Sequence, residues 1–199
     1  SKMKRFFIFN LFYIILFTNF NIAYSISPDV FIQSTVNRAS QILSENISKE
    51  EKMNKLKIIA KETVDIRGVG FYSLSSARKN LNDEQKNTYS NLFEHYFLKS
   101  FSSRLAEYTN TEIEVYNKQI LNKNYTIVNS LLLGTADRPE VKIDWRIYTK
   151  NPNNPLIRDL IIEGLSLART QKEEFSSILN SNNGDISALL KSLEEFSKN

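Results

Sequence analysis

Hydrophobic residues recur every three or four positions in the first half of the chain, which predicts helices. Ser27 and Pro28 supply an N-cap and a first-turn proline, and apolar positions follow at helical spacing as far as Leu43. Ser48 and Glu51 have the spacing of a capping box, so a second helix is expected to begin there. The glycine-containing segment 65–76 is interpreted as a short helix or turn region.

The longest predicted helix begins at Asn82 or Asp83 and runs to about Tyr108. Its apolar positions form one broad aromatic face. They are Tyr89, Leu92, Phe93, Tyr96, Phe97, Phe101, Leu105 and Tyr108. Such a stripe most often packs into a core, so a ligand-lining role for these side chains competes with simple packing against a sheet.

Between residues 112 and 162 the hydrophobic period changes to two, which predicts strands at 112–120, 125–133, 141–148 and 156–162. Short turns separate these segments, so neighbours should pair as an antiparallel meander. Two further helices follow Gly164. The order of elements predicts an α+β domain, in which several helices pack against a curved four-stranded antiparallel sheet.

The N-terminal segment has the pattern of a secretory signal peptide. Lys2, Lys4 and Arg5 precede an apolar run without charges, and small residues flank Tyr24. Cleavage after Ser25 would leave residues 26–199 as a single domain in the periplasm. The strongly apolar run is about a dozen residues, shorter than the roughly 20 of a spanning helix. An uncleaved membrane anchor is the alternative.

Composition changes once this leader is set aside. The chain of 199 residues has 26 basic and 22 acidic residues, and three basic residues leave with the leader, so 23 remain against 22. This near-neutral balance and the absence of a Lys/Arg stripe argue against nucleic acid as a partner. Without cysteine there is no disulfide, thiolate zinc site or cysteine nucleophile, and His95 is the sole histidine. No pattern argues for an enzyme, a metal or a cofactor.

Asp159 to Leu167 resembles a family signature, Asp-Val-x-Ile-Glu-Gly-Val-Ser, of the MlaC family, also called the toluene-tolerance auxiliary proteins. Other segments resemble the same family in the same order. They are Ser27 to Leu43, Asp65, Asp83-Glu84-Gln85 with Tyr89, Phe93 and Tyr96, and Phe175 to Leu179. The chain departs from the family pattern at 69–72, 157–158 and 170–172.

The resemblance implies a periplasmic phospholipid carrier that holds acyl chains in an apolar pocket between sheet and helices. Such carriers pass lipid between an outer-membrane lipoprotein complex and an inner-membrane ABC transporter complex, in support of outer-membrane lipid asymmetry. The residues expected to line the pocket are Phe71, Phe93, Phe97, Phe101, Leu131, Leu133, Val141, Ile143, Trp145, Ile147, Leu160 and Ile162. Two alternatives stay open: a cone-shaped α+β domain for another apolar ligand, and a signal-anchored interaction protein.

Overall fold

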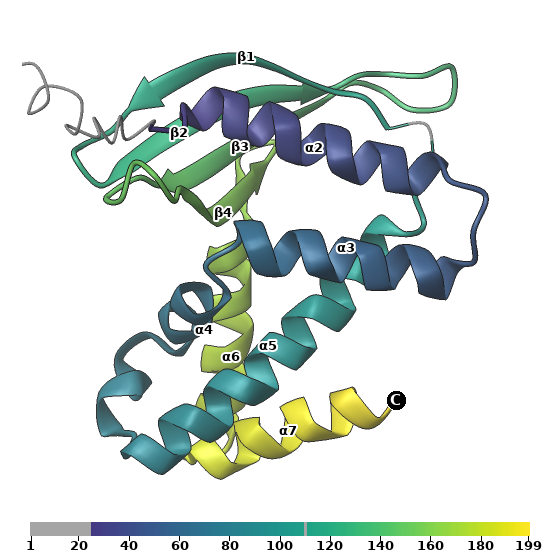
Figure 1. Ribbon diagram of the computed structural model, residues 1–199. Helices are drawn as coiled ribbons and strands as arrows, with labels where there is room; N and C mark the ends of the chain where they lie inside the picture. The colour runs from purple at the N-terminus through teal and green to yellow at the C-terminus, as the bar shows by residue number, and fades with distance from the viewer. Residues whose placement is uncertain (1–24, 110) are drawn as a thin grey trace, which may run out of the picture.

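The computed structural model describes residues 25–109 and 111–199, in which helices precede and follow a block of strands (Figure 1). The first helices are α2 (Pro28–Ser44), α3 (Lys49–Thr63), α4 (Ile66–Leu74), the 3-10 helix η2 (Ser75–Asn80) and α5 (Asp83–Leu105). The remaining elements are β1 (Ile113–Ile120), β2 (Tyr125–Leu132), β3 (Val141–Tyr148), β4 (Leu156–Ile162), β5 (Leu165–Ser166), α6 (Leu167–Ser181) and α7 (Ile186–Lys198). The predicted α+β class is confirmed. Residues 1–24 of the predicted signal peptide lie outside the described residues.

The strands form one antiparallel sheet in the order β1-β2-β3-β4-β5. The predicted meander is therefore confirmed, but the predicted number of strands was one too low. The missing strand, β5, is only two residues long, and it turns back on β4 through Glu163 and Gly164. Both of these residues have left-handed backbone angles (φ 49° and 82°), which is the geometry of a two-residue type I′ hairpin. So short a strand gives no alternating pattern to detect.

The two faces of the sheet differ in chemistry. Val128, Trp145 and Leu160 lie side by side across β2, β3 and β4, and this side is called the inner face. The opposite, outer face carries the polar positions of β3, including Lys142 and Asp144. Helix α2 packs on β1 and β2, whereas α4 and α6 contact β4.

Two groups of buried apolar residues stabilise the fold. The sheet core joins α2 to the inner face; it consists of Ile32, Val36, Val128, Leu132, Ile143, Trp145, Ile147 and Ile157. The helical core lies among α4 to α7; it consists of Ile66, Val69, Leu74, Leu81, Tyr89, Phe93, Phe175, Leu179, Leu189 and Leu193. Val64 packs against both cores and therefore connects them.

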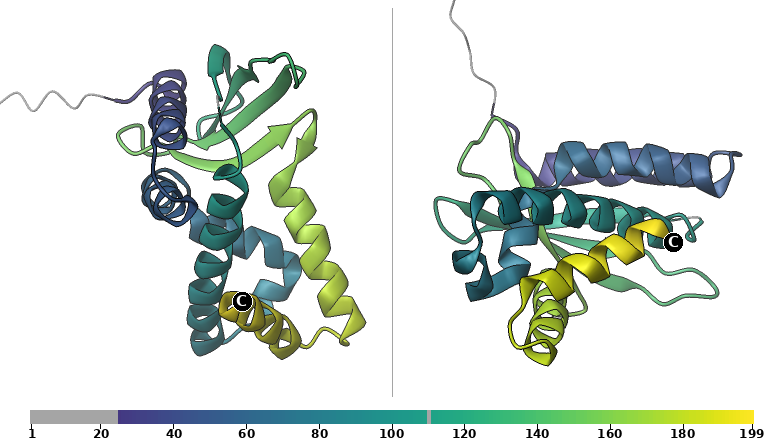
Figure 2. Two further views of the ribbon diagram at one scale, coloured as in Figure 1. Left: turned by 90° about the vertical axis from the view of Figure 1, so that its right-hand side faces the viewer. Right: turned by 90° about the horizontal axis from the view of Figure 1, so that it is seen from below.

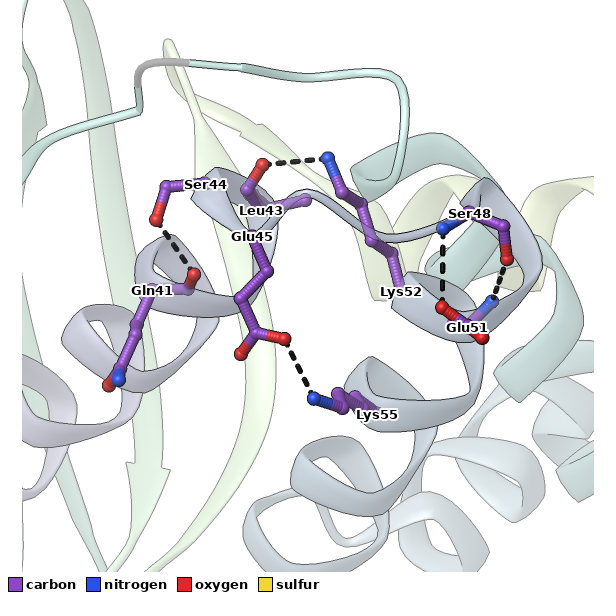
Figure 3. Close-up of polar contacts among 8 residues, drawn as sticks. All are labelled: Gln41, Leu43, Ser44, Glu45, Ser48, Glu51, Lys52 and Lys55. Atoms are coloured by element: carbon purple, nitrogen blue, oxygen red, sulfur yellow. Dashed lines mark hydrogen bonds and ion pairs between the residues drawn. The ribbon is translucent and has the colours of Figure 1, made fainter.

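Polar contacts fix the connection between α2 and α3 (Figure 3). The predicted capping box is present: the Ser48 hydroxyl accepts from the Glu51 N–H at 3.1 Å, and the Glu51 carboxylate accepts from the Ser48 N–H at 3.3 Å. Lys52 donates to the Leu43 carbonyl at 2.9 Å, near the C-terminus of α2, where a positive charge is favourable. The two helices are thereby held as an antiparallel pair beside the sheet.

Candidate functional site

Half of the residues expected to line a pocket lie on the inner face of the sheet. They are Val141, Ile143, Trp145 and Ile147 from β3 and Leu160 and Ile162 from β4. The antiparallel register explains this placement, because Ile143 lies opposite Ile162 and Trp145 lies opposite Leu160. Side chains at directly opposed positions point to the same face of a sheet. The structure therefore brings these six side chains together.

Burial changes along the inner face. At the end of β3 that leads into the β3–β4 loop, Ile147 and its neighbours Val128 and Ile157 are almost completely buried. At the opposite end, called the far end, Val141 and Ile162 keep part of their surface accessible, as does Leu160 nearer the middle. The far end is therefore apolar surface that packing within the chain does not fully cover.

The aromatic residues of α5 also divide into buried and accessible side chains. Phe93 is 1% exposed and belongs to the helical core, whereas Phe97 and Phe101 are only half-buried. The rings of Phe97 and Phe101 stack with their centroids 5.6 Å apart and 9° between their planes. Helix α5 passes below the sheet, with α3 on one side and α6 on the other (Figure 2). It packs against α3, α4 and α7, so the predicted packing of its aromatic stripe directly on the sheet gives way to packing on other helices.

Three of the expected lining residues lie elsewhere. Phe71, on α4, packs against the helical core, with its ring 5.7 Å from that of Tyr89. Leu131 lies opposite Lys142, and Leu133 follows two positions later, so both belong to the outer side of the sheet. The sequence prediction grouped these leucines with Ile143 because the run Leu131-Leu132-Leu133 does not reveal which of its residues faces inward. The register shows that Leu132 does.

The polar groups on the inner face are paired with one another. The indole N–H of Trp145 donates to the Ser130 hydroxyl at 2.9 Å, and that hydroxyl donates to the Ile143 carbonyl at 2.7 Å. Among the described residues, the buried side-chain atoms without a hydrogen-bond partner are Asn129 Oδ1, on the outer face, and Arg138 Nε, in the β2–β3 loop. An apolar molecule on the inner face would consequently leave no unsatisfied polar group beneath it.

The segment that resembles the family signature forms a compact structural unit at the start of α6. The Asp159 carboxylate accepts a hydrogen bond from the Ser166 hydroxyl and another from the Ala168 N–H at 2.9 Å. Ser166 is the N-cap of α6, and its hydroxyl accepts from the Arg169 N–H at 3.0 Å. A residue of β4 thus fixes the first turn of α6, while the Glu163–Gly164 hairpin reverses the chain between them.

A second polar contact links the sheet to the helical core. Asp65 caps α4 by accepting from the Gly68 N–H at 3.0 Å, and its carboxylate also pairs with Arg158 of β4 at 2.6 Å. The guanidinium of Arg158 donates further to the Tyr125 hydroxyl at 3.1 Å and lies 4.6 Å from the centre of the Tyr148 ring. Asp65 therefore serves at once as a helix cap and as an ion-pair partner across the two halves of the fold.

Two tyrosines of α5 are strongly influenced by their surroundings. Burial raises the pKa of Tyr89 far above its ordinary value, and its hydroxyl donates to the Gly70 carbonyl at 2.5 Å. Burial, together with the nearby Glu174 carboxylate, raises the pKa of Tyr96. Both side chains remain neutral at physiological pH and belong to the packing of the helices.

In the described part of the chain, no three His, Cys, Asp or Glu side chains lie close enough to hold a metal ion.

Two features of the structure could not be predicted from the sequence. Gln33 of α2 covers the free edge of β1: its amide donates to the Ile113 carbonyl and accepts from the Val115 N–H, both at 3.0 Å. No sequence pattern marks this role. The second feature is an open, polar hollow along α6, lined by Glu173, Ser176, Ser177, Asn180 and Ser181. Its polar lining makes it unsuitable for acyl chains.

A helical layer below a curved antiparallel sheet, with an apolar inner face exposed at one end, defines a class of small α+β domains that is suited to apolar ligands. A family model described as MlaC protein matches residues 33–195, so the chain belongs to the MlaC family. No curated protein sequence matches it. The fold is similar to that of a phospholipid-binding protein from Ralstonia solanacearum, solved in complex with a phospholipid. The TM-score is 0.73 at 17% sequence identity, covering 87% of this chain and 98% of that one.

Proposed function

We propose that this protein binds phospholipid and carries it between membrane complexes, with acyl chains against the far end of the inner face. The observation that carries the proposal is the half-buried apolar surface formed there by Val141, Leu160 and Ile162. The half-buried rings of Phe97 and Phe101 on α5 would form the opposing wall. The polar groups of the inner face are already satisfied, so desolvation by acyl chains costs little.

Energetics requires that a carrier cover its lipid extensively. Two acyl chains contain about 30 methylenes, and exposing them to water costs roughly 20 kcal/mol or more at about 0.8 kcal/mol each. A shallow contact with a few leucines would recover only a fraction of this free energy. The sheet and α5 must therefore enclose the chains between them, and unloading should require a movement of a helix or a sheet edge.

Relatives support the proposed lipid and its cellular setting. The similar protein from Ralstonia solanacearum holds a phospholipid, and membership of the MlaC family supports exchange with an inner-membrane ABC transporter complex and an outer-membrane lipoprotein complex. We infer that residues 1–25 direct export and are then removed, leaving residues 26–199 in the periplasm. Among the described residues, no helix combines the length and the apolar character needed to cross a bilayer.

Neighbouring isoleucines on β4 allow a well-matched test. Ile162 points to the inner face and Ile161 to the outer face, and both are half-buried. We expect Ile162→Asp to abolish phospholipid recovery with the purified protein, because a carboxylate would have to be desolvated beside the acyl chains. Ile161→Asp should retain it. Mass spectrometry of extracted lipid measures the occupancy, and circular dichroism checks that both variants are folded.

Two results would overturn the proposal. A folded Ile162→Asp protein that still carries phospholipid at the wild-type level would show that the acyl chains do not lie on the inner face. A wild-type protein that stays empty after incubation with phospholipid vesicles would contradict lipid carriage itself. Recovery of a different apolar molecule at stoichiometric level would instead support the alternative of another apolar ligand.

A further inference from the structure

The end of the sheet opposite the far end forms a distinct tip, made of three segments. These are the start of the described chain at residues 25–30, residues 120–124 at the β1–β2 turn, and the β3–β4 loop at 149–155 (Figure 1). The Thr149 N–H donates to the Asn124 carbonyl at 2.7 Å, and the Ile26 N–H donates to the Pro152 carbonyl at 3.1 Å. Backbone hydrogen bonds therefore hold the three segments together.

The tip carries some of the most exposed apolar side chains of the described residues. Ile120 is 78% exposed and the adjacent Leu121 is 50% exposed. Ile26 and Val30, at 44% and 61%, lie on the neighbouring segment. Single exposed apolar residues are common on protein surfaces, but four on two of these hydrogen-bonded segments indicate a surface that another apolar medium covers.

Positive charge exceeds negative charge at the tip, which has two lysines and one carboxylate. The β1–β2 turn contains Lys123, the β3–β4 loop contains Lys150, and neither segment contains a carboxylate. No ion pair joins either lysine to an acidic group within the part of the chain that the structure describes. The acidic residue of the tip, Asp29 in segment 25–30, already pairs with Lys118 at 3.2 Å. The other polar residues of the two segments are mostly asparagines, which are neutral.

We propose that the tip docks on the surface of an anionic phospholipid bilayer. Exposed isoleucine and leucine side chains would enter the boundary between headgroups and acyl chains, and the two lysines would approach the lipid phosphates. Charge complementarity favours an anionic partner, because Lys123 and Lys150 have no carboxylate on their own segments and Asp29 is already paired with Lys118. The docking does not depend on lipid carriage, since it uses none of the inner-face residues.

Docking fixes an orientation for the molecule. The tip and the far end are opposite ends of the same strands, because β3 begins at Val141 and ends at Tyr148. With the tip on a bilayer, the accessible apolar residues of the far end point away from that bilayer. Lipid exchange at the far end then takes place with a partner protein rather than with the bilayer beneath the tip.

Vesicle binding tests this proposal. The protein recovered from cells, with its N-terminus determined by mass spectrometry, is sedimented with vesicles of equal parts phosphatidylglycerol and phosphatidylcholine. We expect the double variant Ile120→Asp/Leu121→Asp to bind these vesicles at least tenfold more weakly than the wild type. Ile58 on α3 is also exposed, at 57%, so Ile58→Asp is the matched control and should bind normally. Lys123→Gln and Lys150→Gln should each reduce binding about fivefold. Lys191→Gln, on α7 and away from the tip, is the control for these lysine variants and should bind normally.

A local probe keeps the test decisive if the double variant fails to fold. The Ile120→Trp protein should show a blue-shifted fluorescence emission when anionic vesicles are added, against the constant background of the buried Trp145. Equal binding of the Ile120→Asp/Leu121→Asp and Ile58→Asp proteins would overturn the proposal. So would an unshifted emission from the Ile120→Trp protein, or binding to pure phosphatidylcholine vesicles that is as strong as binding to anionic ones. If a variant that does not bind vesicles still carries phospholipid, the loss of docking is distinct from a loss of the proposed carrier function.

Discussion

In the helical core, Tyr89 and Phe93 are 0% and 1% exposed, and the ring of Phe175 meets that of Phe93 edge-on at 6.1 Å. At the far end of the inner face, Val141 and Ile162 are just as apolar but remain half-buried. Both regions arise from recurring hydrophobic positions in the sequence. In the helical core the side chains bury one another, whereas at the far end Val141 and Ile162 keep accessible surface, and α5 packs mainly on other helices.

This difference in burial separates the residues that stabilise the fold from those that can bind a ligand. A side chain that is already buried contributes its full transfer free energy to folding, and a ligand can gain little more from it. A half-buried apolar side chain contributes less to folding and retains free energy that a ligand can use. The most apolar positions of a sequence are therefore poor guides to a binding surface, and incomplete burial in the folded chain is the better guide.

The largest expected effect comes from truncating one aromatic residue in each region. Phe93→Ala should lower the free energy of unfolding by about 3–5 kcal/mol, because it leaves a cavity in a packed core. Phe101→Ala removes a half-buried ring and should cost about 1 kcal/mol, but it should lower phospholipid occupancy. Urea unfolding and lipid mass spectrometry measure the two quantities. Equal stability losses for both variants would contradict the division into a packed core and a binding surface.

The connection between the two regions gives an intermediate effect. Asp65→Ala removes both the cap of α4 and the ion pair to Arg158, and we expect a loss of about 2 kcal/mol. Asp65→Asn keeps an oxygen for the Gly68 N–H while removing the charge, so it should cost about half as much. Unfolding followed separately by Trp145 fluorescence, which reports the sheet, and by far-ultraviolet circular dichroism should show transitions that coincide in the wild type. If the ion pair does not connect the regions, Asp65→Asn will cost almost nothing and Asp65→Ala will cost only the loss of the cap.

The sequence predicted the class of fold, the order of the strands and the helix starts at Ser48 and Asn82, because these features rest on local periodicity and capping chemistry. It also identified six residues that the structure gathers on the inner face. It misplaced Leu131 and Leu133, because a run of three leucines does not specify a register. It could not distinguish Phe93 from Phe97, since burial depends on α6 and α7, which lie 70 or more residues further along the chain.

The smallest effect concerns the link between β4 and α6, one of the helices that flank the far end. Ser166→Ala removes the acceptor for the Arg169 N–H and the donor to Asp159, so it should cost about 1 kcal/mol. Ser166→Thr should restore most of this stability, and Ser177→Ala, on the exposed side of the same helix, should change it by less than about 0.5 kcal/mol. Hydrogen exchange of the first turn of α6 provides the decisive readout. Because the hydroxyl fixes this turn to β4, exchange should accelerate there in Ser166→Ala while the amides of the helical core keep their protection. Accelerated exchange throughout both regions would instead mean that α6 opens only with the whole domain, and that it cannot move alone to release a lipid.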